Sequence, residues 1–385
     1  MKYLHYILFL CVALATHAQT ALNHTGGMQV HDGAEVGFHI NFMNNSPFDQ
    51  NLGLVGFYGP RFLTIRGTTS PTFYDFEIFA NNGVTLEVAT NATNNVNFVS
   101  GNIITQKSLE DIYFGLLDNA MHNGESNMSK INGYALITNQ QTYQFPIGDE
   151  FQLRPLILNS NSVNLTAKCA YFFENPNAPL SFTQTFDTGD KDRQLSLINT
   201  QEFWRLESSV PSTVTISWNS RSAINTLTEV IENLLVVGWN KAEEKWDILG
   251  NTVVSGDSEN GIITSEEFLP DDYEIITIGS LLVPQDRLTI DNFYLSPNGD
   301  GINDVLVIEE LELSSQNELK LYDRNGLLVF RQENYTNEFA GISNIDNNVI
   351  QRDAGLPSGI YFYIVNMYDL GYEFQGFLYL AQPTY

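Results

Sequence analysis

Cysteine is almost absent from this sequence, which excludes a common source of stability in exported proteins. The two cysteines are Cys11 and Cys169, and Cys11 lies in an apolar stretch near the start of the chain. If that stretch is an export signal that is removed, Cys169 remains alone and no disulfide can form within one chain. The protein must then be stabilised by burial, and 385 residues, 43% of them hydrophobic, are enough for two or three domains with apolar cores.

Basic residues are also scarce. The chain has 18 Lys and Arg residues against 45 Asp and Glu residues, which gives a formal net charge of -27. Nucleic acids and anionic membrane surfaces are bound through clusters of basic side chains. Because the sequence contains no such cluster, we expect no nucleic-acid partner. The acidic excess is explained by solubility, and cations, above all calcium, are the ligands that it permits.

Long hydrophobic runs are missing, except for a short one at the start. Residues 6–15 are apolar, follow Lys2 and precede Thr16-His17-Ala18, which is a small-x-small cleavage pattern. A membrane-spanning helix needs about 20 apolar residues. The sequence therefore predicts a signal peptide over residues 1–18 and no transmembrane helix.

The motifs of common catalytic and metal sites are absent as well. The sequence has no His-Glu-x-x-His or Cys/His metal spacing, no Gly-x-Ser-x-Gly elbow, no P-loop and no dinucleotide fingerprint. We therefore expect a protein that is not an enzyme. A facing pair of carboxylates of the glycosidase kind has no sequence signature among 45 acidic residues, and this one class of site stays open.

Helical periodicity is rare, whereas short alternating runs bounded by Gly, Asn, Asp and Pro recur throughout the chain. This pattern predicts an all-β, multidomain protein. In the first predicted domain, residues 19–142, turns such as Asn81-Asn82-Gly83 separate many short strands. Two architectures fit this region: a short β-solenoid, in which rungs stack on one another, or an ordinary antiparallel sandwich.

Residues 143–282 have the strand-and-turn spacing of an immunoglobulin-like β-sandwich and contain all four tryptophans. Trp218 alternates with Val214 and Ile216 along one predicted strand, so we expect it in the core. Trp239 and Trp246 instead flank the polar segment 240–245. We expect these two indoles to be partly exposed, and they are our candidates for stacking against sugar rings.

A Pro- and charge-containing segment, residues 283–287, predicts a linker to a last unit over residues 288–385. The unit begins with an acidic, glycine-rich stretch, continues through an Asn-Gly hairpin and then a Leu-Pro-x-Gly turn that leads into a Tyr-rich strand. The residues of these motifs are Ser296, Pro297, Asn298, Gly299, Asp300, Gly301, Asn303, Asp304, Asn325, Gly326, Leu356, Pro357, Gly359 and Tyr361.

These motifs, in this order, resemble the gliding motility-associated C-terminal domain family, the type B sorting domain of the Bacteroidetes type IX secretion system. The resemblance covers about a quarter of the chain. It implies a small β-sandwich, recognition by the type IX secretion machinery, export across the outer membrane, and a final location at the cell surface or outside the cell.

The opening stretch also resembles calcium loops, in which oxygen ligands alternate along a chain that a glycine bends sharply. Asn298, Asp300 and Asp304 would supply side-chain oxygens, and Ile302 its carbonyl. Ser296 stands where strong sites carry Asp, and no bidentate Glu follows. Calcium binding and a loop closed by its own hydrogen bonds are therefore both open at this point.

The function that follows is a non-catalytic cell-surface protein, exported by type IX secretion and acting as an accessory component of gliding motility or adhesion. Its expected partner is an outer-membrane or cell-surface protein, such as a gliding adhesin assembly. The alternative is a secreted cargo of the same pathway that binds or degrades polysaccharide.

Overall fold

The computed structural model describes residues 20–282, 293–345 and 355–382. The chain divides into two compact units, residues 1–281 and 282–385. The signal peptide predicted over residues 1–18 and the linker predicted over residues 283–287 lie outside the described residues. Those that are described form strands and short 3-10 helices, which confirms the all-β prediction, and they contain no helix with the length and apolarity that crossing a bilayer requires.

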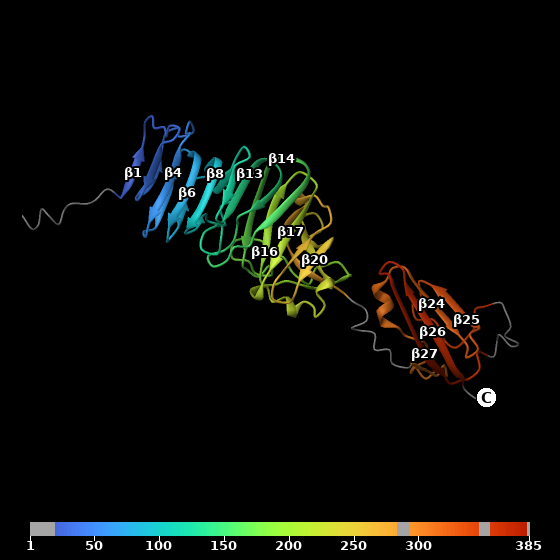
Figure 1. Cartoon of the computed structure of the whole chain (residues 1–385). Coiled ribbons are helices and arrows are strands. Elements are labelled where there is room, and N and C mark those ends of the chain that lie inside the picture. Colours follow the sequence, from blue (N-terminus) through green and yellow to red (C-terminus); the bar gives the residue numbers. More distant parts are fainter. Residues whose placement is uncertain (1–19, 283–292, 346–354, 383–385) are drawn as a thin grey trace, which may run out of the picture. The chain divides into compact units, whose positions relative to one another are not determined.

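The first unit begins as a β-solenoid, which decides between the two predicted architectures (Figure 1). Successive strands alternate between two parallel sheets, so each rung adds one strand to each sheet. One sheet contains β1 (Ala21–His24), β3 (Asn41–Asn44), β5 (Leu63–Gly67), β7 (Val84–Leu86), β9 (Ile103–Ile104) and β12 (Ile131–Asn132). The other contains β2 (Glu35–Phe38), β4 (Leu54–Gly59), β6 (Thr72–Ala80), β8 (Thr90–Ser100), β10 (Tyr113–Leu116) and β13 (Tyr134–Phe145), with β11 (Met121–Asn123) paired to β8.

The core of the solenoid is a column of inward-facing aromatic rings. Phe38, Phe57, Phe76 and Phe114 follow one another with ring centroids 5.1, 5.6 and 5.1 Å apart. Inward and outward side chains alternate along a strand, and aliphatic inward side chains such as Val55 and Ile78 are buried in the same core. At the corners the rungs approach closely: a Cβ on Gly101, which has φ +86°, would lie 1.7 Å from the carbonyl oxygen of Ala80.

The second solenoid sheet continues without a break into an antiparallel sheet. β13 pairs antiparallel with the long strand β14 (Leu156–Phe172), and the boundary predicted between residues 142 and 143 falls inside β13. From β14 the sheet continues through β16 (Phe203–Ser208), β22 (Tyr273–Leu281), β18 (Leu234–Asn240) and β19 (Lys245–Gly250). One hydrophobic cluster extends from Val30 to Ile278, so the solenoid and this region share a core.

The same hydrogen-bonded sheet branches at the beginning of β14. There Leu156 to Ser160 pair with β17 (Ser212–Trp218), which pairs in turn with β21 (Gly261–Thr264), and β21 pairs with β20 (Val253–Gly256). β15 (Leu195–Ile198) pairs with β22. Short 3-10 helices connect these strands: η1 (Ser220–Ser222), η2 (Ile224–Thr226), η3 (Ile231–Asn233) and η4 (Pro270–Asp272).

The described part of the second unit is one five-stranded sheet in the order β23-β27-β26-β24-β25. Its strands are β23 (Phe293–Leu295), β24 (Asn317–Tyr322), β25 (Leu328–Glu333), β26 (Gly359–Met367) and β27 (Tyr372–Leu380). One face is covered by Leu306, Ile308, Tyr335, Phe339 and the helix η6 (Glu309–Leu313), rather than by a second sheet among the described residues.

Candidate functional site

The three sequence motifs of the C-terminal unit meet at one end of its sheet. β23 ends at Leu295, which is level with Leu380 and, one strand further, with Gly359 at the start of β26. β24 ends at Tyr322, whose neighbour on β26 is Phe362, so the Asn-Gly hairpin also lies at this end. Segments far apart in the sequence are thereby gathered at one edge of the fold.

The acidic motif forms a loop that Asp304 closes. Its Oδ1 accepts hydrogen bonds from the backbone amides of Asn298 at 2.9 Å and Gly299 at 2.7 Å, and its Oδ2 accepts one from Gly301 at 2.7 Å. The hydrogen bonds from Gly299, Gly301 and Asn298 lower the pKa of the Asp304 carboxyl. Gly299 and Gly301 have φ of +82° and +84°, a conformation that glycine adopts without strain.

The oxygens predicted to hold calcium accept hydrogen bonds within the same loop. Asn298 Oδ1 accepts from the amide of Asp300 at 2.9 Å, and Asp300 Oδ1 accepts from the amide of Ile302 at 2.8 Å. The hydroxyl of Ser296 donates to the carbonyl of Ile302 at 3.5 Å. In the parts of the chain that the structure describes, no group of three or more His, Cys, Asp or Glu side chains is arranged to hold a metal ion. The loop is closed by its own hydrogen bonds, and calcium binding stays an untested alternative.

The other motif residues shape turns. Asp323 Oδ1 accepts hydrogen bonds from the amides of Asn325 at 2.9 Å and Leu327 at 2.8 Å, which closes the hairpin between β24 and β25. Leu356 is buried, and the Tyr361 hydroxyl donates to the carbonyl of Pro357 at 2.8 Å. These contacts indicate that the motif fixes the fold of the unit.

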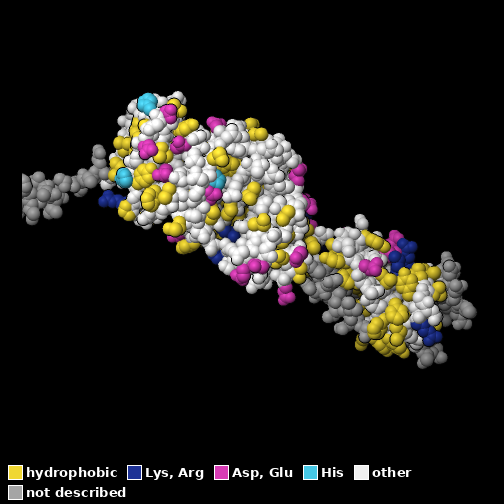
Figure 2. Space-filling model, in the orientation of Figure 1, with side chains coloured by type: hydrophobic (Ala, Val, Ile, Leu, Met, Phe, Trp, Pro, Cys, Tyr) yellow, Lys and Arg dark blue, Asp and Glu magenta, His cyan; other side chains and the backbone are white. Residues whose placement is uncertain are grey.

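None of the described residues covers the other face of this sheet, which is aromatic, a feature that the sequence motifs do not include. Its side chains are 37% to 53% exposed, and they are Tyr294, Ile360, Phe362, Phe377 and Tyr379. They form one surface because Ile360 pairs with Tyr379, Phe362 pairs with Phe377, and the rings of Tyr294 and Tyr379 stack at 6.0 Å. Figure 2 shows hydrophobic side chains gathered on this unit. We call this surface the aromatic face.

The two tryptophans proposed for sugar binding are buried, so the prediction that they are partly exposed is wrong. Trp239 is 4% exposed and Trp246 is 0% exposed. They pair across β18 and β19, with ring centroids 5.7 Å apart in an edge-to-face contact, and Trp239 also contacts Phe186. Phe186 packs against Trp239 and Lys191 forms a β-bridge with Trp246, so the segment 175–192 lies against this pair, and the polar hairpin sequence gave no sign of it. Trp218 is buried, as predicted.

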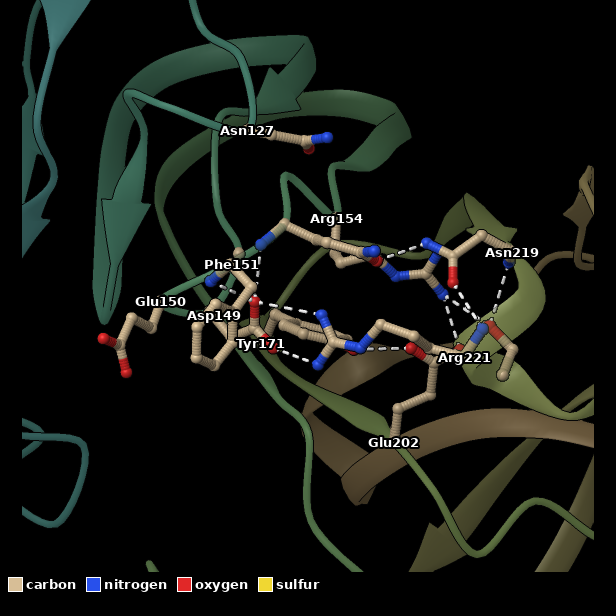
Figure 3. Close-up of polar contacts among 12 residues, drawn as sticks. Asn127, Asp149, Glu150, Phe151, Arg154, Tyr171, Glu202, Asn219 and Arg221 are labelled. Carbon is tan, nitrogen blue, oxygen red and sulfur yellow. Dashed lines mark hydrogen bonds and ion pairs between the residues drawn. The ribbon is translucent and has the colours of Figure 1, made fainter.

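A network of buried charge lies where the solenoid meets the antiparallel region (Figure 3). Arg154 and Glu202 are 2% and 1% exposed, and Arg154 Nη2 lies 2.5 Å from Glu202 Oε1. The same nitrogen donates to the carbonyl of Ser217 at 2.7 Å, and the Tyr171 hydroxyl donates to Glu202 Oε2 at 2.6 Å. The pair is also hydrogen-bonded to Tyr171 on β14 and Ser217 on β17, whereas the Nε of Arg154 is buried without a hydrogen-bond partner among the described residues.

Beside this network, Asp149 forms an ion pair with Arg221 and accepts hydrogen bonds from the amides of Phe151 and Gln152. Burial acts to raise the pKa of the Asp149 carboxyl, but these partners together hold it below its usual value. Burial also lowers the pKa of Lys107 to about 8, and its ammonium donates to the carbonyl of Tyr171 at 2.6 Å.

These residues line a hollow of about 490 Å³. Because Lys107, Asp149 and Arg221 already have partners within the protein, the arrangement serves to hold the two parts of the first unit together. The ion pair between Arg154 and Glu202, 48 positions apart, has no signature in the sequence.

A comparison with known protein families identifies the C-terminal unit. Residues 288–380 match the CHU_C type IX secretion signal domain. No curated protein and no solved structure matches the chain. Residues 288–380 are therefore a type IX secretion signal domain, the C-terminal sorting domain of gliding motility-associated proteins, and the protein is a cargo exported across the outer membrane to the cell surface or the extracellular space.

Proposed function

We propose that this protein is a non-catalytic component of the cell surface that assists gliding motility or adhesion. The observation that carries the proposal is the combination, in one chain, of a type IX secretion signal domain with a β-solenoid. Stacked rungs present a regular, extended surface, which suits attachment to a long or repeated partner. The chain also lacks the common catalytic motifs, in line with this role.

Deletion of the gene tests this role. We expect slower colony spreading and weaker attachment to surfaces, both restored by the full-length gene. Affinity purification of the tagged protein from its own outer membrane should recover gliding or adhesin subunits. Normal spreading and attachment after deletion, together with free protein in the medium, would contradict the proposal and favour a secreted polysaccharide-binding cargo.

We also propose that the secretion machinery contacts the aromatic face. Exposed apolar patches of this kind mark interaction sites, and the machinery is the partner that the signal domain implies. Phe362 is paired with Phe377 on β27 and Tyr322 on β24, and it borders a hollow of about 550 Å³.

The double variant Phe362→Ser and Tyr379→Ser should not be exported across the outer membrane. Cell fractionation should therefore find it in the periplasm. Phe79→Ser is the matched control, because Phe79 is 50% exposed and Phe362 is 49% exposed, but Phe79 lies in the solenoid. Normal export of a folded double variant would rule out the aromatic face as the contact.

A further inference from the structure

The solenoid carries a polar groove on the outer side of its second sheet. The residues of β2, β4, β6, β8 and β11 align in two outward columns. The first column is Glu35, Leu54, Asp75, Asn95 and Met121, and the second is Gly37, Gly56, Glu77, Asn97 and Asn123. A hollow of about 640 Å³ runs over these strands. The hollow therefore crosses several rungs and runs along the solenoid axis.

A tyrosine ring lies flat on the sheet at the edge of this groove. A Cβ placed on Gly56 would lie 2.1 Å from the hydroxyl oxygen of Tyr58, and a Cβ placed on Gly37 would lie 3.0 Å from its ring. The ring thus covers two neighbouring rungs where both have glycine. Tyr58 is half-buried, so one side of the ring rests on the backbone and the rest remains accessible.

Polar side chains beside the ring are held in place by one another. The Tyr58 hydroxyl donates to Glu77 Oε1 at 2.9 Å, and Asn97 Nδ2 donates to Glu77 Oε2 at 2.5 Å. In the next column, Asn94 Nδ2 donates to Asp75 Oδ1 at 2.7 Å. Each carboxylate oxygen has two acceptor sites, so these bonds orient Asp75 and Glu77 and leave capacity to accept further donors.

Burial, with the hydrogen bond to Glu77 and its negative charge, raises the pKa of Tyr58 to about 12. The phenol therefore stays neutral and continues to donate to Glu77 at any physiological pH. The edge of the groove combines a flat ring with fixed acceptors, which is the combination of apolar floor and few placed polar groups that small-ligand sites use.

We propose that this groove binds an extended, uncharged, β-1,4-linked polysaccharide, with one sugar ring on Tyr58 and its hydroxyls donating to Asp75 and Glu77. The carboxylates disfavour anionic glycans, because like charges repel at this distance. The rungs repeat every ~4.8 Å, close to the length of one sugar unit in such a chain, so successive units meet successive rungs. This ligand deepens the proposed adhesive role and rests on it.

A purely structural role for Tyr58, covering the two glycines, makes a different prediction. In that case, substitution of Tyr58 changes only the stability of the protein, and substitution of Glu77 does not change the affinity for the oligosaccharides. Gly56→Ala separates the two roles, because the added methyl displaces the ring from the sheet and leaves the tyrosine itself in the protein.

The test is isothermal titration of the purified full chain with the hexasaccharides of cellulose, mannan, xylan and chitin, and with polygalacturonate. We expect binding to at least one neutral hexasaccharide and none to polygalacturonate. Tyr58→Ala, Gly56→Ala and Glu77→Gln should each weaken binding by tenfold or more. Thr85→Ala, an outward position on β7 in the opposite sheet, is the matched control and should bind as the wild type does.

Failure to bind any of the four neutral hexasaccharides at millimolar concentration would overturn the inference. So would unchanged affinity in folded Glu77→Gln and Gly56→Ala proteins. The titration uses purified protein, whereas the adhesive role is tested by gene deletion, so the two proposals can fail separately. If the protein binds a hexasaccharide but its deletion does not change spreading, the adhesive role is wrong and the binding site is retained.

Discussion

The two units each contain a sheet with one buried face, but they differ in what the other face presents to solvent. In the solenoid, the outward columns of β2, β4, β6 and β8 carry mainly glycine, amide and carboxylate groups. In the sorting domain, the outward positions of β26 and β27 carry Phe and Tyr. A polar groove suits a hydrated ligand, whereas an exposed aromatic surface suits another protein. The two sheets thus present chemically different surfaces to solvent.

The units can be compared separately because all four tryptophans lie between residues 204 and 246. Tryptophan fluorescence therefore reports unfolding of the first unit only, and calorimetry reports both. This separation makes the following predictions independent of one another.

The largest expected effect is in the buried network of the first unit. Arg154→Met leaves Glu202 buried without its cation, which costs about 3–5 kcal/mol of unfolding free energy. Urea unfolding followed by tryptophan fluorescence measures it. The double variant Arg154→Met with Glu202→Leu is the control and should recover much of the loss. If the single variant unfolds like the wild type, the pair does not hold the two regions together.

Two glycines sharpen the comparison between the units. Gly101 and Gly326 have similar φ values, +86° and +80°, but a Cβ on Gly101 meets the carbonyl of Ala80 whereas a Cβ on Gly326 meets nothing within 4 Å. Gly326→Ala should therefore cost only the left-handed conformation, about 1–2 kcal/mol. Gly101→Ala should cost more, because the rungs must also move apart. Calorimetry measures both losses of stability. If they are equal, the rungs at the solenoid corner move apart at little cost in free energy.

Acid should destabilise the sorting domain through Glu318. Although burial opposes it, hydrogen bonds from Lys320, Tyr368 and Arg331 lower the pKa of Glu318 to about 2, from an ordinary value of 4.5. A depressed carboxyl pKa stabilises the folded state above the unfolded pKa, and this contribution is lost as pH falls from about 4.5 to 2. As the pH falls through this range, the melting temperature of the sorting domain, measured by calorimetry, should decrease less in Glu318→Gln than in the wild type. If the melting temperature of the variant depends on pH as that of the wild type does, Glu318 is not the source of the acid sensitivity.

The smallest expected effect concerns calcium. Because the oxygens of the 298–304 loop accept its own amide hydrogens, we expect EGTA to leave the melting temperature of the second unit unchanged. Asp304→Ala should lower it, since three amides lose their acceptor. A drop on chelation that Asp300→Ala abolishes would support the calcium loop instead.

Some of this architecture was readable from the sequence because it depends on local chemistry. Alternation and turn residues indicate strands wherever they occur, so the all-β class followed directly. The motif from Ser296 to Asp304 consists of residues whose side chains bond to amides a few positions away, as Asp304 does. Local interactions of this kind leave a compact signature, which is why the sorting domain and the route of export were predictable.

The solenoid itself was less visible. Its rungs recur about every 20 residues, as the pairing of Ala21 with Asn41 and of Asp75 with Asn95 shows. Stacking requires only apolar inward positions and small residues at the corners, so outward positions vary freely and no strict repeat appears. The sequence therefore left both solenoid and sandwich open, with only a slight preference for the solenoid.

What the sequence by itself determined is that the chain is an all-β protein with a type IX sorting domain. Only the tertiary structure decided that Trp239 and Trp246 are buried, that Arg154 meets Glu202, and that Tyr58 lies over Gly37 on the neighbouring rung. Each of these depends on which distant segment lies alongside. Exposure and pairing are properties of that juxtaposition, and the chemistry of a residue and its near neighbours does not encode them.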